Sequence, residues 1–347
     1  MDDERMRIVV IDNQISGNTV YQLSGKEITC CHVANGICEK VGENFTGPSH
    51  GSVCAALAAE FFPHDDIIGI SVADEQTNLS VSNVCKALSW CVTQSVQIVC
   101  MSIGTTNWLA SLSMKDITKK LAEQGTKIFA AVDPAGILTF PACYPWITAV
   151  KCELENAAIT RNSNQLKVFD ISVGYFSSDV LDTLSLEDRF FLSRTSSMAV
   201  PFVASQMTRR SEKRNTWNRN NSVIDSIKVD KKKVEVKSIE IPIVRIIDQN
   251  RRELQLQHLF WEKGYMACLF SGKRKTNWAE LIVAIDNSDN FEIAIHALKE
   301  ASIILVDKDV DGKIIDSKQD YVLDISKADI ADAYEQIEMF FSNETDS

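Results

Sequence analysis

Several features are missing from the 347-residue sequence, and each absence excludes a class of protein. No stretch approaches the roughly 18 uninterrupted apolar residues that a membrane-spanning helix needs, so we expect no membrane anchor. Lys and Arg number 36 against 47 Asp and Glu, and this net charge of −11 argues against nucleic acid as the main partner. The acidic start MDDERMRIVV does not resemble a secretory signal, and we therefore expect a cytoplasmic protein.

The ten cysteines lack the paired C-x₂-C spacing of zinc sites. The segment CCHVANGIC, residues 30–38, contains residue types that bind metals, but without that spacing we expect no metal there. Half of the cysteines sit in apolar runs, where a free thiol behaves as a small hydrophobe: Cys54, Cys85, Cys91, Cys100 and Cys268. We therefore expect reduced thiols, as is usual in the cytosol, and neither a metal nor a cofactor.

The sequence does contain an alternation of β-like apolar runs and helical stretches between residues 7 and 208. This alternation predicts an α/β fold, in which a parallel sheet is flanked by helices. The expected strands are 7–12, 66–73, 96–104, 127–133 and 146–153. The expected helices are 49–62, 81–94, 114–125 and 197–208. Ligands of such sheets bind at the carboxyl ends of the strands, so the candidate site residues are those that end a strand.

The composition changes after residue 208. Residues 209–233 contain nine basic and three acidic residues, and we interpret 209–229 as a solvated linker, with a docking patch for an acidic peptide as the alternative. Residues 230–347 predict a second, smaller α+β domain. Its C-terminal helix lies within SKADIADAYEQIEMFF, where Ser326 and Asp329 form a capping box, and DKDVDGK (307–313) is interpreted as a hairpin turn.

Polar residues stand where several predicted strands end and helices begin. VVIDNQI ends a strand at Asp12, GPSHGSVCAALAA starts a helix at His50, and VCMSIGT carries Ser102 at a strand end. FAAVDPAG ends a strand at Asp133, and SRTSSMAVP places Ser197 where a helix begins. Each residue alone has an ordinary explanation, since a serine at that last position can simply cap the helix. The combination of these residues and their order along the chain form a more specific pattern than any one residue alone.

In this order the segments resemble the subtilisin-like serine proteases, or subtilases, over residues 6–208 and not beyond. The resemblance implies a catalytic triad of Asp12, His50 and Ser197, in the chain order that subtilisin uses. The residue types suit the chemistry. A serine attacks when an imidazole removes its proton, and a carboxylate fixes the tautomer of that imidazole. An alternative register makes Ser196 the nucleophile, with one residue inserted before the Met-Ala-x-Pro turn.

The same resemblance implies a substrate-binding edge at Ser102, Ile103 and Gly104, which would pair with the substrate backbone. It also places Asp133 where the family has an asparagine that donates a hydrogen bond to the oxyanion. An ionised Asp133 would repel that charge, whereas a protonated one could donate almost as the amide does. We therefore expect catalysis that is slowed or shifted in pH rather than abolished.

Other departures from the family are local. Asn13 and Gln14 replace Thr-Gly after the aspartate, Val53 replaces the second histidine of the helix, and the glycine before the nucleophile is absent. Six residues precede the first strand, so we expect no inhibitory prosegment and, in consequence, a narrow range of substrates.

The sequence thus predicts a cytoplasmic subtilisin-like serine endopeptidase for a peptide or protein substrate, with leader removal from a ribosomally made peptide suggested by analogy. The appended domain would recognise the substrate, a partner subunit or a second copy of the chain. The first alternative is a pseudoprotease that binds peptide, or supports a partner, without cutting it. The second is an enzyme whose acyl intermediate is passed to another acceptor, which gives ligation or macrocyclisation.

Overall fold

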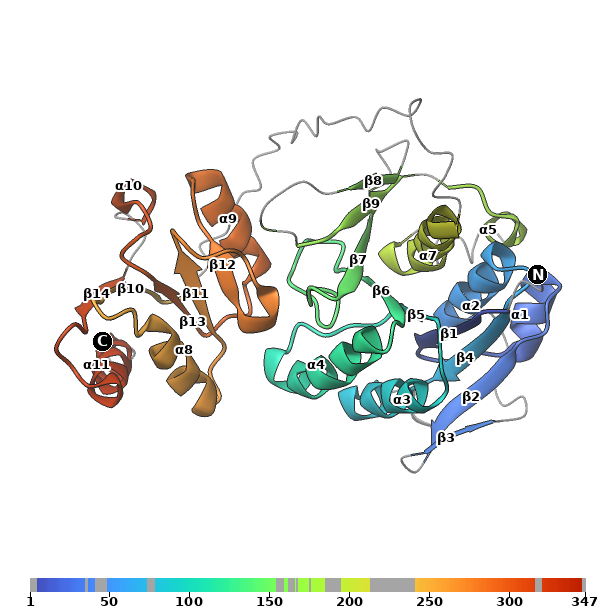
Figure 1. The fold of residues 1–347 in the computed structure, drawn as a ribbon, viewed down its shortest axis with the longest axis horizontal. Helices are drawn as coiled ribbons and strands as arrows, with labels where there is room; N and C mark the ends of the chain where they lie inside the picture. Colours follow the sequence, from blue (N-terminus) through green and yellow to red (C-terminus); the bar gives the residue numbers. More distant parts are fainter. Residues whose placement is uncertain are drawn as a thin grey trace.

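The computed structural model describes residues 5–34, 37–40, 49–73, 79–153, 159–161, 166, 168–174, 176–184, 195–212, 241–315 and 320–344. These residues form a nine-stranded sheet and a separate five-stranded sheet, both visible in Figure 1. In the described parts of the chain, no helix has the length and apolar character needed to cross a membrane.

The larger sheet confirms the predicted α/β class. Its strands follow the spatial order β3-β2-β4-β1-β5-β6-β7-β9-β8, and the inner strands pair in parallel while β3 and β8 are antiparallel at the edges. The strands are β1 (Arg7–Asp12), β2 (Thr29–Ala34), β3 (Ile37–Lys40), β4 (Asp66–Ser71), β5 (Ile98–Met101), β6 (Lys127–Ala131), β7 (Ile147–Cys152), β8 (Ile159–Arg161) and β9 (Ile171–Val173). The segment CCHVANGIC supplies β2 and β3, which pair with each other.

Helices cover both faces of this sheet, as Figure 1 shows. They are α1 (Gly17–Ser24), α2 (His50–Phe61), α3 (Val81–Thr93), α4 (Trp108–Glu123), α5 (Asp179–Thr183) and α7 (Ser196–Glu212). One apolar core packs β1 residues Ile8 and Val10 against α1, α2, α5 and α7, and the other packs Val9 and Ile11 against α3 and α4. Alternate residues of a strand point to opposite faces, so β1 supplies both cores.

The smaller sheet has the order β12-β11-β13-β10-β14, and every pair of neighbours in it is parallel. Its strands are β10 (Ile243–Ile247), β11 (Ala267–Ser271), β12 (Ile282–Ala284), β13 (Ile303–Val306) and β14 (Tyr321–Asp324). Its helices are α8 (Glu253–Glu262), η1 (Trp278–Glu280), α9 (Ser288–Ala297), α10 (Gly312–Ile315) and α11 (Ile330–Glu344).

This topology corrects part of the prediction for the second domain. Its parallel strands alternate with helices, so it is α/β in type rather than α+β. The segment 307–313 is not a hairpin turn, because it leads through α10 to a strand on the far side of β10. The last helix begins at Ile330, where the Asp329 carboxylate accepts a hydrogen bond from Ala331 N at 2.8 Å. The predicted linker overlaps the end of α7, and its residues 213–229 lie outside the described residues.

The smaller sheet packs against the α4 side of the larger one (Figure 1). Lys115 Nζ on α4 donates to the carbonyl of Ala279 at 2.6 Å, and the rings of Trp108 and Trp261 lie 5.1 Å apart. The apolar core beneath α3 and α4 continues without a break into the residues under α9, which include Phe291 and Leu298. The two sheets therefore share buried apolar surface.

Candidate active site

Asp12 is the last residue of β1, and the strand's alternation sets its direction. Ile8 and Val10 face the layer that contains α2, so Asp12, two residues later, points to that layer as well. Its side chain is buried, with 1% of its surface exposed. A carboxylate in such a place requires a hydrogen-bonding or charged partner.

His50 is that partner, and the start of α2 holds it in position. The Ser49 side chain caps the helix by accepting from Ser52 N at 3.2 Å, while its hydroxyl donates to Gln14 O at 2.6 Å. Gly51 allows α2 to approach the end of β1 closely. A β-carbon on Gly51 would lie 2.6 Å from Gln14 O and 2.9 Å from Cβ of Asp12, so any other residue would push the helix away.

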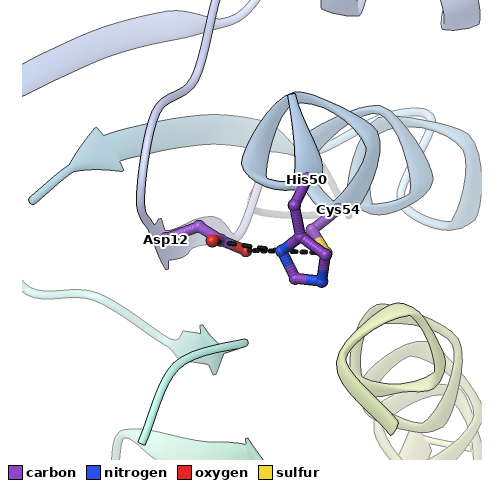
Figure 2. A group of neighbouring side chains, drawn as sticks. All are labelled: Asp12, His50 and Cys54. Atoms are coloured by element: carbon purple, nitrogen blue, oxygen red, sulfur yellow. Dashed lines mark hydrogen bonds and ion pairs between the residues drawn. The ribbon is translucent and has the colours of Figure 1, made fainter. Parts of the chain in front are cut away.

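The imidazole and the carboxylate are in direct contact, as Figure 2 shows. His50 Nδ1 lies 3.0 Å from Oδ2 and 3.2 Å from Oδ1 of Asp12. With Nδ1 donating to Asp12, the neutral ring keeps an unprotonated Nε2 that can accept a proton. Burial by itself would lower the pKa of His50, but the bond to Asp12 and the contact with Cys54 outweigh it and raise the pKa to about 11.

Cys54 is a neighbour that the sequence reasoning treated only as a core thiol. It lies one turn after His50 on α2, and its Sγ is 4.0 Å from His50 Nδ1. Residues four apart share one face of a helix, so the His-x₃-Cys spacing is the signal that could have found it. The side chain is fully buried, and burial raises the pKa of its thiol. We therefore expect a neutral thiol packed beneath the imidazole.

Asp12, His50 and Cys54 also form the one group of metal-binding residue types, among those the structure describes, whose ligand atoms all lie within 4.8 Å of one another. Asp12 and His50 already satisfy each other by a hydrogen bond. We therefore interpret the group as a proton-transferring pair with a buried thiol beside it. The other candidate of the sequence, CCHVANGIC, forms the β2–β3 pair, where His32 Nε2 is 2.9 Å from the carbonyl of Ala73.

The two serines at the start of α7 have different environments. Ser196 is buried, and its Oγ accepts from Cys152 N at 3.2 Å. Ser197 is partly exposed, and its Oγ donates to the carbonyl of Ser102 at 3.1 Å. No hydrogen bond between Ser197 and His50 is present in the described part of the chain, so the structure joins Asp12 to His50 but does not join His50 to the serine. The exposure of the two hydroxyls favours Ser197 as the nucleophile.

The predicted substrate edge follows β5 directly. Ser102 is buried, whereas Gly104 is exposed, and the chain beyond it pairs with Phe140 through reciprocal hydrogen bonds of Thr105 at 2.9 and 2.8 Å. A β-carbon on Gly104 would come within 2.6 Å of the Thr139 side chain. The edge is therefore packed tightly against the loop that follows β6.

That loop begins at Asp133, which is partly exposed. Its Oδ1 accepts a hydrogen bond from Ala135 N at 2.8 Å, and its own N–H donates to Thr139 Oγ1 at 3.0 Å. The carboxylate therefore bonds to its own loop through Oδ1. Thr139, which touches both this loop and the substrate edge, was not singled out in the sequence.

A further hydroxyl lies just before α7. Thr195 O accepts the first helical hydrogen bond, from Ala199 N, but Thr195 Oγ1 is buried with no hydrogen-bond partner among the described residues. The family has a glycine at this position, as the resemblance implies. This side chain therefore places a buried polar atom two residues before Ser197.

No family model matches this chain, and no curated protein matches it. Among solved structures, it is similar to a lanthipeptide protease, with 14% identity and a TM-score of 0.44 over 63% of this chain and 76% of that one. It is also similar to the prenylagaramide maturation protease PagA, with 14% identity and a TM-score of 0.39 over 60% and 78% of the two chains. A third is the epidermin leader peptide processing serine protease (EpiP) from Staphylococcus aureus, with 11% identity and a TM-score of 0.44 over 59% and 65%.

Proposed function

We propose that this chain is a subtilisin-type serine endopeptidase that cuts a narrow set of peptides in the cytosol. The observation that carries the proposal is the buried Asp12 in hydrogen-bond contact with His50, at the same end of the sheet where Ser197, in the first turn of α7, bonds to Ser102.

The chemistry starts with a rotation of the Ser197 hydroxyl from the carbonyl of Ser102 to His50 Nε2. As Oγ attacks the substrate carbonyl carbon, its proton passes to Nε2, and Asp12 stabilises the imidazolium. The oxyanion receives the N–H groups at the N-terminus of α7 and a hydrogen bond from protonated Asp133. The C–N bond then breaks, and the leaving amine takes the proton from His50. Water removes the acyl group by the same steps in reverse.

The substrate would lie along Ser102, Ile103 and Gly104 as an added strand, paired through backbone groups. Gly104 is exposed, while the next residue, Thr105, already pairs with Phe140. We further propose leader removal from a ribosomally made peptide as the reaction, which comparison of product masses from a candidate precursor can test. Masses of joined or cyclised products would instead favour transfer of the acyl group to an amine.

A pseudoprotease is the second candidate. The bond from Ser197 to the carbonyl of Ser102 and the inward turn of the Asp133 carboxylate favour it, because neither group is poised for catalysis in this state. In this case the edge at Ser102–Gly104 would bind peptide without cutting it.

Labelling with a fluorophosphonate probe separates the two candidates. We expect wild-type protein and Ser196→Ala to be labelled and Ser197→Ala to remain unlabelled. If only Ser196→Ala loses the label, Ser196 is the nucleophile, as the alternative register proposes. A wild-type protein that binds the peptide but resists the probe would support the pseudoprotease.

A further inference from the structure

The loop that carries Asp133 rests on the smaller sheet rather than on the subtilisin-like part of the chain alone. His296, in the last turn of α9, has its Nε2 2.8 Å from the carbonyl of Ala135. Three residues further along the loop, Leu138 N donates to the carbonyl of Ala297 at 2.8 Å. The loop thus meets the C-terminal end of α9 through hydrogen bonds at two positions.

Packing reinforces these hydrogen bonds. Leu138 is 2% exposed and belongs to the apolar core that continues beneath α9. Gly136 turns the loop with φ of +83°, a conformation that suits glycine, and a β-carbon there would lie 3.8 Å from the His296 ring. The His296 ring therefore lies beside the turn at Gly136.

The hydrogen bonds form a continuous connection between α9 and Asp133. His296 Nε2–H donates to Ala135 O, and Ala135 N–H donates to Asp133 Oδ1. Since a carbonyl only accepts, Nε2 must carry the proton, which holds for the imidazolium and for one neutral tautomer. The two hydrogen bonds of Ala135, one to His296 and one to Asp133 Oδ1, fix the orientation of the Asp133 carboxyl group and leave its Oδ2 as the oxygen available to the site.

We propose that His296 is a positioning residue for Asp133, and that the smaller sheet thereby orients the oxyanion donor of the larger one. This inference rests on the proposed function, because orientation of Asp133 matters for catalysis only if Asp133 faces the oxyanion. A displacement of about 1 Å at a catalytic group can lower the rate by about 100-fold. His296→Ala should therefore lower kcat by about 10- to 100-fold and leave KM nearly unchanged.

A double-mutant cycle separates positioning from a general structural effect. His296→Ala should have no further effect on kcat in an Asp133→Ala background, because the group that it orients is already absent. His296→Gln, whose amide can donate to Ala135 O, should restore part of the rate. His258→Ala is the matched control, since His258 lies on α8 against Trp261. Equal losses of kcat from His296→Ala in both backgrounds would overturn the proposal.

Amide hydrogen exchange tests the same contact without relying on activity. Ala135 N and Gly136 N both donate to Asp133, and their exchange should become faster in His296→Ala but not in His258→Ala. Unchanged exchange of these amides in a folded His296→Ala protein would refute the positioning role. If wild-type protein cuts no peptide yet this exchange increases, the proposed function fails while the contact from α9 to the loop stands.

Discussion

Asp133→Asn is the substitution that tests the proposed role of Asp133 as a donor to the oxyanion. The structure shows that Asp133 Oδ1 accepts from Ala135 N at 2.8 Å, and an asparagine can keep this bond through its own Oδ1. The amide then presents an N–H where the second carboxyl oxygen lies. A side-chain donor of this kind contributes about 10²–10³ in kcat, or about 2.7–4 kcal/mol of transition-state stabilisation. We expect kcat to rise, by at most that factor.

The pH dependence identifies the cause of such a gain. The pKa of His50 is raised, mainly by the bond to Asp12 acting against burial, so its base form grows only as pH rises. An amide donates its N–H at every pH, so the rate of Asp133→Asn should increase with pH through the pKa of His50.

The assay is the pH profile of kcat and kcat/KM on one peptide for wild type, Asp133→Asn and Asp133→Ala. Asp133→Ala loses both the donor and the bond to Ala135, so it should be the slowest of the three at low pH. A slower Asp133→Asn enzyme with an unchanged profile would refute the reasoning. It would mean that another group holds the oxyanion and that Asp133 only shapes its loop.

Three further changes test other parts of the structure. Asp12→Asn should lower the pKa of His50 in an NMR titration. At a pH above the pKa of His50 in both proteins, it should also lower kcat by about 10⁴-fold, because an imidazole without this carboxylate adopts the wrong tautomer. It should further remove the stability that the raised pKa supplies below pH 6.5 and that is lost as pH rises towards about 11. Cys54→Ala leaves part of a fully buried site empty, so the free energy of unfolding measured in urea should fall by about 1 kcal/mol. The same substitution should change the pKa of His50, and an unchanged pKa would contradict the contact between the thiol and the imidazole. Removal of residues 230–347 uncovers apolar surface beside α4, so the melting temperature should fall by several degrees and cleavage of the natural peptide should be impaired. An unchanged melting curve and an unchanged turnover would show that the first domain is independent of the second.

The sequence was sufficient where one local pattern decides the structure. The apolar run RIVVID predicts a strand that ends at Asp12, and the apolar run after Ser49 predicts α2 with His50 in its first turn. The predicted ends of helices were less accurate than their predicted presence. The helix expected at 114–125 begins at Trp108, because the Asn107 side chain accepts from Ala110 N and caps it there.

Sequence reasoning failed where a pattern is compatible with two topologies. The polar run 307–313 suits either a hairpin or the entry to a crossover helix, since both need turn-forming residues. Which of the two forms depends on β10, which β13 and β14 flank on opposite sides. That choice is made by tertiary packing, so the α+β interpretation of the second domain could not have been corrected from the segment itself.

The contact between α9 and the Asp133 loop illustrates a different limit. His296 and Ala135 are 161 residues apart, and neither lies in a motif that refers to the other. The subtilase resemblance ends at residue 208, yet the apolar core that supports the substrate edge and the Asp133 loop does not end there, since Leu138 and Phe140 share it with Phe291 and Leu298. A loop with an ionisable group in place of an amide has more need of a fixed orientation, because a carboxyl that turns away donates nothing. The smaller sheet supplies contacts that hold this loop, and the unit that performs the proposed chemistry therefore extends beyond the part of the chain that resembles a protease.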